Sequence, residues 1–504
     1  MEKPKVLLLY PPNQMWPIET PRPDGSIGPL YLAGALEAAG FEVDILDTTV
    51  GSENDSLADT FYRSIMQANG LTRIGMSLER IRDFVLAGKY DIVGISSNFT
   101  SQTRMALEVA AEIKQANPDI WVIAGGGNAR NLWPRFLNGS FDLVCLTEGE
   151  RIIVKIAKEW PGGFERISGV AYKKEGRQIV NPVKPDDIYS KLNQLPFPAW
   201  KKLLFNKYDQ IASPHGVVVA KEKHRCAPVM TSRGCPYHCE YCHVSYEKLH
   251  PEAFGPIGNL RFKSVSRVIE EIFCLKDLGV SRIFFEDDSL LADKKRVKAI
   301  FEQVSNLGLT IADVNGVNLV HFLRRIGERL TVDEEFLKLL KSSGFDQIVF
   351  PVESASQRII KKYASSKLDL ARFNVVELVK IANQVGIACP INMMIGFPDE
   401  TEEEMRQSID LGKKLVDAGA PYCTFFIPIP FPGTNLFETA IKEGYLSSDF
   451  DPDLMNWKNI NAVMINTTVA PERIAELRDQ AWREVNTAEH VAMRLSASIG
   501  NRPK

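Results

Sequence analysis

Three cysteines lie close together in the segment RGCPYHCEYCHV. Cys235, Cys239 and Cys242 are spaced by four and three residues, although the chain of 504 residues contains only eight cysteines. Clustered thiolates are soft ligands for zinc or for an iron–sulfur cluster. Three unliganded cysteines would be an unusual concentration, so the segment predicts a metal centre.

Several kinds of centre are compatible with this spacing. A structural zinc ion needs a fourth ligand, and His238 or His243 is close enough in sequence to supply it. A redox CxxC pair would use two of the three cysteines and leave Cys235 without a role. A 4Fe–4S cluster held by three cysteines would leave one iron open for a substrate or cofactor.

The residues around the cysteines predict a barrel. From 226 to 435, six strand-like runs alternate with helical patterns, which indicates a partial (β/α)6 TIM-type barrel. The cysteines follow the first of these strands, at the end where barrel enzymes place their chemistry. Two helices are expected to open with Thr-x-x-Glu capping boxes, at Thr331 and Thr401. Residues 436–504 are predicted to form a helical C-terminal domain.

The residues before the barrel predict a second α/β unit. Residues 1–160 contain the apolar runs KVLLLY, FEVDILD, YDIVGIS, IWVIAGG and FDLVCL, separated by helical patterns, and this is typical of a doubly wound, Rossmann-like parallel sheet. No GxGxxG follows the first strand, so a nicotinamide cofactor is not expected. Residues 161–225 lose the alternation and are predicted to be a linker with one hairpin.

Composition narrows the class of protein. Apolar residues make up 45% of the chain, charged residues 24%, and the net charge is −3, which is typical of a soluble globular protein without a nucleic-acid partner. No apolar run reaches the roughly 20 residues that a membrane helix needs. The remaining cysteines are scattered, which favours a reducing compartment and hence the cytoplasm.

The cysteine segment resembles the radical S-adenosylmethionine (SAM) superfamily, whose CxxxCxΦC motif has an aromatic residue before the last cysteine. Tyr241 occupies that place. The later segments FFEDDSLL, PVESAS, MMIGFPDETEEE and IPFPGTNLF resemble successive strand-end motifs of the same superfamily. The resemblance implies a 4Fe–4S cluster on the three cysteines. It also implies SAM contacts from Tyr241, Asp287, Asp288, Glu353, Ser354, Gly396 and Pro398.

The first unit resembles the cobalamin-binding domain that precedes many radical SAM barrels, through GISSNFTSQ, AGGGNARNLWP and LVCLTEGE. The resemblance implies cobalamin contacts from Ser96, Ser97, Thr100, Ser101, Gly125, Gly126 and Gly127. Cobalamin domains of other families ligate cobalt through the histidine of a DxHxxG motif. No histidine precedes His215 here, so this ligation is not expected within the first unit.

Together the two resemblances imply a cobalamin-dependent radical SAM C-methyltransferase of the class B type. In such enzymes a reduced cluster cleaves SAM to a radical that takes hydrogen from an unactivated carbon, and methylcobalamin supplies the methyl group. The expected partners are a small-molecule substrate and a low-potential electron donor, flavodoxin or ferredoxin.

Three other functions stay open. The first is a radical SAM cyclase or rearrangement enzyme without net methyl transfer. A methylthiotransferase is a weaker alternative, because that family has three further cysteines in its N-terminal domain and only Cys145 is present here. The third is a zinc-stabilised protein without enzymatic activity, which iron and sulfide analysis would distinguish.

Overall fold

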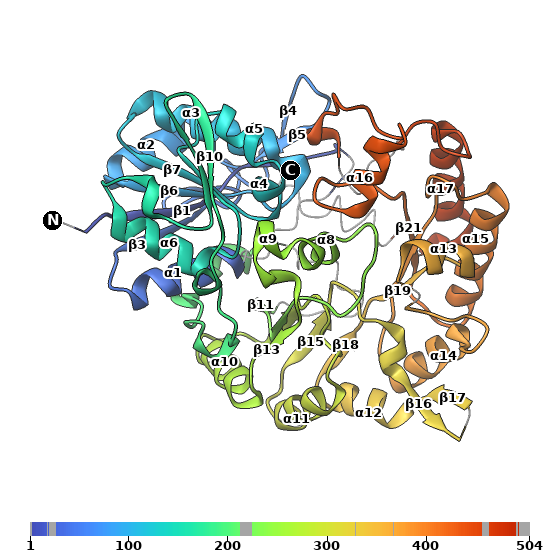
Figure 1. The fold of residues 1–504 in the computed structure, drawn as a ribbon. Coiled ribbons are helices and arrows are strands. Elements are labelled where there is room, and N and C mark those ends of the chain that lie inside the picture. The colour runs from blue at the N-terminus through green and yellow to red at the C-terminus, as the bar shows by residue number, and fades with distance from the viewer. Residues whose placement is uncertain are drawn as a thin grey trace.

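The first part of the chain forms an α/β domain around one seven-stranded sheet (Figure 1). The computed structural model describes residues 3–17, 19, 27–211, 224–327, 329–365, 367–455, 463–489 and 492. The strand order is β10-β9-β8-β7-β6-β1-β3, and β1, β3, β6, β7 and β8 run parallel. The strands are β1 (Val6–Tyr10), β3 (Val43–Asp47), β6 (Ile92–Ser96), β7 (Trp121–Gly125), β8 (Leu143–Cys145), β9 (Val170–Lys174) and β10 (Arg177–Asn181).

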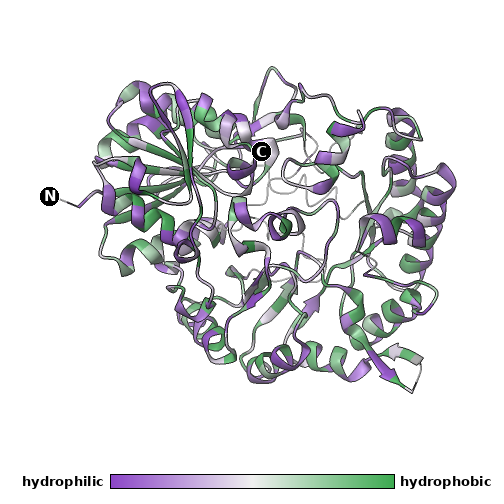
Figure 2. Ribbon diagram, in the orientation of Figure 1, coloured by the Kyte–Doolittle hydropathy of each residue, from purple (hydrophilic) through white to green (hydrophobic). Residues whose placement is uncertain are grey.

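Alternation along the strands divides the domain core between the two faces of this sheet. Leu7 and Leu9 of β1 pack on one face with α2 and α3, whereas Val6 and Leu8 pack on the other with α1 and α6. Figure 2 shows the hydrophobic colour following these strands. The helices are α1 (Ile27–Ala38), α2 (Leu78–Gly88), α3 (Thr103–Ala116), α4 (Gly127–Asn131), α5 (Trp133–Asn138) and α6 (Gly149–Glu159).

Two smaller features complete this domain. The hairpin expected in the linker is β9–β10, and its first strand pairs antiparallel with β8, so the hairpin extends the sheet of the α/β domain. A separate three-stranded sheet joins β2 (Asn13–Met15), β5 (Thr72–Ile74) and β4 (Ile65–Met66).

The second part of the chain contains parallel strands in sequence order. One sheet has the order β11-β14-β15-β18 and the next has β19-β20-β21, and a parallel bridge between Gln347 and Ala388 connects them. Only two residues separate β18 from β19, so the two sheets follow each other closely along the chain. The predicted (β/α)6 barrel stays a prediction. The strands are β11 (Cys226–Val229), β14 (Arg282–Phe285), β15 (Thr310–Asp313), β18 (Phe345–Gln347), β19 (Phe350–Glu353), β20 (Ile391–Met394) and β21 (Cys423–Phe426).

Helices alternate with these strands and share one large core with them. They are α10 (Val265–Asp277), α11 (Lys294–Val304), α12 (Glu334–Ser342), α13 (Gln357–Tyr363), α14 (Val375–Val385) and α15 (Glu402–Asp417). The capping box at Thr401 is confirmed, because its side chain accepts from the backbone N–H of Glu404. The box expected at Thr331 is wrong. Asp333 caps α12 instead and accepts from Phe336, because residues 329–332 belong to a short strand, β17.

The last part of the chain is helical, as predicted, with α16 (Asn435–Lys442), the 3-10 turn η8 (Pro452–Leu454) and α17 (Pro471–Val485). The α/β class of the fold is thereby confirmed. Among the described residues, no helix combines the length and the apolar character that crossing a membrane requires.

Candidate functional site

The cysteine loop lies between β12 (Ser232–Arg233) and α8 (His243–Leu249), after β11. Its backbone is held from several sides. The N–H of Cys235 donates to Gly258 O at 3.3 Å, and the N–H of Glu240 donates to Tyr363 O at 2.9 Å. Lys248 Nζ donates to the carbonyl of Cys235 at 2.8 Å. These hydrogen bonds hold the backbone of the loop that carries the three cysteines in one conformation.

One glycine makes this loop possible. Gly234 has φ +82°, and a Cβ there would lie 2.3 Å from the carbonyl oxygen of Asn259. Only glycine accepts both the left-handed backbone and this close approach. The glycine that precedes the first cysteine is thus required by the shape of the loop.

The three thiols fit a metal cluster by their chemistry. All three are free thiols, and burial raises their pKa values, that of Cys242 to about 12. A bound cluster would replace these protons with cationic iron. In the part of the chain that the structure describes, no three His, Cys, Asp or Glu side chains gather as ligands of one metal ion. A zinc ion needs each ligand at about 2.0–2.3 Å from a single centre, whereas each cysteine of a 4Fe–4S cluster binds its own iron.

The acidic pair after β14 contacts the cysteine loop. Asp287 is buried and accepts from the N–H of Thr231 and from the hydroxyls of Thr231 and Ser232, at 2.7 and 2.5 Å for the two hydroxyls. Asp288 accepts from the N–H of Gly234 at 2.8 Å. The two carboxylates thus hold residues 231–234, which lead into the cysteine loop. Their contact with SAM stays a prediction.

The end of β19 brings a buried ion pair to the same loop. Glu353 has the unusual φ of +68° and pairs with Lys367. Burial opposes the charge of Lys367, but Glu353 and Cys239 outweigh it and raise its pKa. Ser354 contacts the hydroxyl of Ser408 at 3.2 Å. No spacing pattern predicted a role for Lys367, which lies near Cys239 only in the folded chain.

The turn after β20 is closed by the C-terminal helix. Gly396 has φ +97°, and a Cβ there would lie 2.5 Å from Ile474 of α17. Glu400 accepts from the N–H groups of Gly396 and Phe397 through one oxygen. Its other oxygen is buried and has no hydrogen-bond partner among the described residues. Burial raises the pKa of Glu400 to about 7. Pro398 accepts from Thr468 through its carbonyl.

An aromatic layer joins this turn to the cysteine loop. The ring of Tyr241 lies 6.1 Å from that of Phe397, which in turn stacks on Tyr363 at 4.3 Å. Burial, with the nearby Glu353 carboxylate as a lesser cause, raises the pKa of the Tyr241 hydroxyl. Of the predicted SAM residues, Asp288 and Glu353 thus lie beside the cysteine loop that contains Tyr241. Ser354, Gly396 and Pro398 lie against Ser408, Ile474 and Thr468, respectively.

The predicted cobalamin residues also lie together, at the carboxyl ends of β6 and β7. Ser96 pairs with Gly125 across these strands, and the N–H of Ser97 donates to Gly125 O at 2.7 Å. Thr100 and Ser101 form the turn η1 (Thr100–Gln102) directly after β6. The structure thus gathers residues that are separated by up to 31 positions in the chain.

Two features of this glycine-lined edge (Ser96–Gln102 and Gly125–Asn128) fit a bound ligand. A Cβ on Gly125 would meet no atom of the described residues within 4 Å, so these residues leave the space beside it open. Asn128 donates to Ser97 Oγ and Thr103 Oγ1, whereas its buried Oδ1 has no hydrogen-bond partner in the part of the chain that the structure describes. Cobalamin carries amide side chains on its corrin ring, and such groups can donate to this oxygen.

The α/β domain contacts the region that carries the cysteine loop at one interface. Gly433, in the loop after β21, packs against Asn131 of α4, and a Cβ on Gly433 would lie 2.2 Å from the Asn131 side chain. Thr147 Oγ1 donates to the carbonyl of Phe254 at 2.6 Å. The carboxyl edge of the α/β domain thereby contacts the side of the second region that carries the cysteines.

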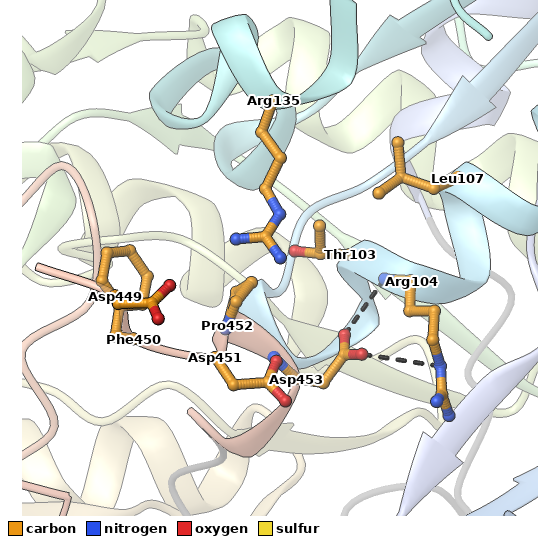
Figure 3. Close-up of a pocket in the computed structure, with 9 residues that line it drawn as sticks. All are labelled: Thr103, Arg104, Leu107, Arg135, Asp449, Phe450, Asp451, Pro452 and Asp453. Carbon is orange, nitrogen blue, oxygen red and sulfur yellow. Dashed lines mark hydrogen bonds and ion pairs between the residues drawn. The ribbon is translucent and has the colours of Figure 1, made fainter. Parts of the chain in front are cut away.

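A pocket of the α/β domain is lined in part by residues 449–453, which follow α16. It has a volume of about 340 Å³ and lies between α3, Arg135 of α5 and residues 449–453 (Figure 3). Asp453 accepts from the N–H of Arg104 at 3.0 Å and lies 3.6 Å from its Nε. Asp453 thus caps the N-terminus of α3, for which Gln102 supplies no side-chain cap. No pattern in the sequence predicted this contact.

Comparisons with known proteins agree with this arrangement. Residues 229–412 match the model of the radical SAM superfamily, and residues 25–157 match that of the B12 binding domain. The chain is 31% identical to an uncharacterised methyltransferase of Pyrococcus horikoshii over 78% of each chain. It is 27% identical to the cytidylyl-2-hydroxyethylphosphonate methyltransferase of Streptomyces wedmorensis, over 96% of this chain and 90% of that one.

A solved structure has the same fold. The radical SAM methyltransferase TsrM of Kitasatospora setae, solved with cobalamin and a 4Fe–4S cluster bound, superimposes with a TM-score of 0.62 at 17% identity. The match covers 95% of this chain and 85% of that one. It includes both the α/β domain and the region that carries the cysteine loop.

Proposed function

Since the chain belongs to the cobalamin-dependent radical SAM methyltransferases, with a 4Fe–4S cluster, SAM and cobalamin as cofactors, we propose that it methylates an unactivated carbon of a small molecule. The carrying observation is the contact of the carboxyl edge of the α/β domain with the region that carries the cysteine loop, through Thr147 and Phe254 and through Asn131 and Gly433. Transfer of a methyl group between cofactors and substrate requires such closeness.

The chain's own residues have separate tasks in this proposal. Cys235, Cys239 and Cys242 would hold the cluster, which with SAM supplies a radical, while cobalamin supplies the methyl group. Asp287 and Asp288 fix the cysteine loop. The glycine-lined edge would bind cobalamin, with Asn128 Oδ1 as an acceptor for one of its amides.

Exclusion of water is the task of the C-terminal part. Ile474 of α17 covers Gly396, and Thr468 closes on Pro398. A radical formed in an enclosed site is protected from solvent and from side reactions. We further propose an external flavodoxin or ferredoxin as the electron donor, and the cytoplasm as the location.

Product analysis tests carbon methylation. The enzyme, reconstituted with iron, sulfide and hydroxocobalamin, is given SAM, a low-potential reductant and candidate substrates. Cytidylyl-2-hydroxyethylphosphonate, on which the Streptomyces relative acts, is the first to try. We expect 5′-deoxyadenosine and S-adenosylhomocysteine in near-equal amounts per methylated product, and deuterium from the reacting carbon in 5′-deoxyadenosine. Turnover that yields 5′-deoxyadenosine without S-adenosylhomocysteine would contradict methyl transfer and favour the cyclase alternative.

A further inference from the structure

A buried ion pair joins the α/β domain to the start of the cysteine loop. Arg233 lies two residues before Cys235, and its guanidinium contacts Glu150 at 2.5 Å and Glu148 at 3.3 Å. The same guanidinium lies over the ring of Tyr31, 5.1 Å from its centroid. Only 14% of the Arg233 side chain and 7% of that of Glu150 are exposed. The start of the loop is thus tied to two acids of the other domain.

A second buried ion pair joins the same domain to the end of the cysteine loop. Glu247 lies in α8, five residues after Cys242, and pairs with Arg130 of α4. Their side chains are 6% and 10% exposed. Arg130 also lies over the ring of Phe254, 5.8 Å from its centroid. The three cysteines are therefore bracketed in sequence by two links to the α/β domain.

The partners on the α/β domain share one location. Arg130 follows Gly127 by three residues, and Glu148 and Glu150 lie at the start of α6, directly after β8. All three belong to the carboxyl edge of the sheet, which also carries the glycine-lined edge. The two ion pairs hence connect the cysteine loop to the part of the domain proposed to hold cobalamin.

Stability alone does not explain such links. A buried ion pair contributes little net stability, because the charges lose their hydration, and apolar contacts of similar size would hold two domains together at least as well. What a paired guanidinium and carboxylate provide is a fixed geometry. Links on both sides of one short loop fix its position relative to the other domain.

We propose that Arg233, Glu148, Glu150, Arg130 and Glu247 are positioning residues, which set the separation between the cysteine loop and the glycine-lined edge. The part of this inference that concerns coupling rests on the proposed function: a fixed separation keeps SAM cleavage in step with methyl transfer. The part that concerns distance does not depend on it.

Charge reversal at the second pair is the sharpest test. The variants are Arg130→Glu, Glu247→Arg and the double reversal. Lys413→Glu serves as the control, because it reverses one charge of an exposed ion pair with Glu484 that does not involve the α/β domain. Pulsed dipolar spectroscopy measures the distance between cob(II)alamin and the reduced cluster. Small-angle scattering of the cofactor-free proteins measures the arrangement of the domains. The yields of 5′-deoxyadenosine and S-adenosylhomocysteine are compared after addition of SAM and dithionite.

Each single reversal should shift or broaden the distance distribution and the scattering profile. It should raise the ratio of 5′-deoxyadenosine to S-adenosylhomocysteine about tenfold or more, since displacements of about 1 Å have effects of this size or larger. The double reversal should restore the ratio to within about threefold of wild type, and the control should leave it unchanged. If a single reversal does not fold, Arg130→Lys and Glu247→Gln should shift the same measurements in the same direction by a smaller amount.

An unchanged distance distribution in the single variants would overturn the proposal, even if their melting temperatures fell, because the pairs would then serve stability only. Failure of the double reversal to restore the distance would overturn it as well. If wild type forms no S-adenosylhomocysteine, the proposed function fails, whereas the distance measurements still decide the positioning role.

Discussion

The cysteine loop and the glycine-lined edge are two candidate cofactor sites built on different physical grounds. The loop offers three side chains that can bond covalently to iron, held by a backbone with little freedom. The edge offers open space beside Gly125 and neutral polar atoms such as Asn128 Oδ1. A site of the first kind depends on a few residue types, whereas a site of the second kind depends on shape. The two should therefore respond differently to substitution.

The largest effect is expected at the cysteines. Replacing Cys235, Cys239 and Cys242 together with Ala should lower the iron content after reconstitution from about four atoms per chain to near zero. Cobalamin binding should persist in the same protein, because the glycine-lined edge lies on the other domain. Iron and sulfide analysis, with the optical spectrum, measures both. Iron retained at about four atoms per chain would show that the cluster lies elsewhere.

Filling the open space beside Gly125 should affect the glycine-lined edge and leave the cysteine loop unchanged. Gly125→Leu places a side chain in the open space beside the strand and should weaken hydroxocobalamin binding about 10- to 100-fold, since overpacking costs about 1–3 kcal/mol. Iron content should match wild type. Binding is measured by spectral titration. Wild-type affinity in this variant would mean that cobalamin does not occupy the space at Gly125. It would contradict the view that the glycine-lined edge binds its ligand through its shape.

The ionisation of Glu400, in the turn that carries the predicted SAM residue Gly396, should make the free energy of unfolding depend on pH. Burial raises the pKa of Glu400 to about 7 from an ordinary 4.5. The folded protein thus binds this proton more tightly than the unfolded chain, so stability falls as pH rises and the loss is complete above about pH 7. The loss amounts to about 3 kcal/mol at most. Glu400→Gln should remove it, as denaturant unfolding at pH 5 and pH 8 would measure. An identical pH dependence in both proteins would show that Glu400 is not desolvated.

The smallest effect is expected from a single amide. Asn128→Ala removes the acceptor proposed for cobalamin and should weaken hydroxocobalamin binding by a few-fold, in keeping with about 1 kcal/mol for a neutral hydrogen bond. Asn138→Ala, on an exposed part of the same domain, serves as the control. If both variants bind equally well, Asn128 Oδ1 does not face the ligand.

The sequence predicts these two regions unequally. Cys235, Cys239 and Cys242 are recognisable by residue type and spacing, and the alternation of strands and helices around them predicts the α/β fold. The direction of a side chain is not encoded in that pattern. The SAM contact of Asp287 stays a prediction, and no pattern in the sequence indicated that its carboxylate accepts from the N–H and hydroxyl of Thr231 and the hydroxyl of Ser232.

Contacts between distant segments were beyond prediction for a related reason. Arg130 and Glu247 are separated by 117 residues, and neither carries a local signal of its partner. The hairpin β9–β10 was expected in the linker because its residues fit a hairpin. Its pairing with β8 depends on an exposed strand edge that only the folded domain presents.

The carboxylate of Asp453 at the N-terminus of α3 has a consequence for synthesis on the ribosome. The α/β domain is complete by about residue 211, and Asp453 follows 242 residues later. At about 5–20 residues per second, roughly 12 to 50 seconds pass between the two. The nascent domain thus has time to fold before Asp453 caps the N-terminus of α3. The cap on α3 is therefore completed by a segment that is synthesised long after the domain itself.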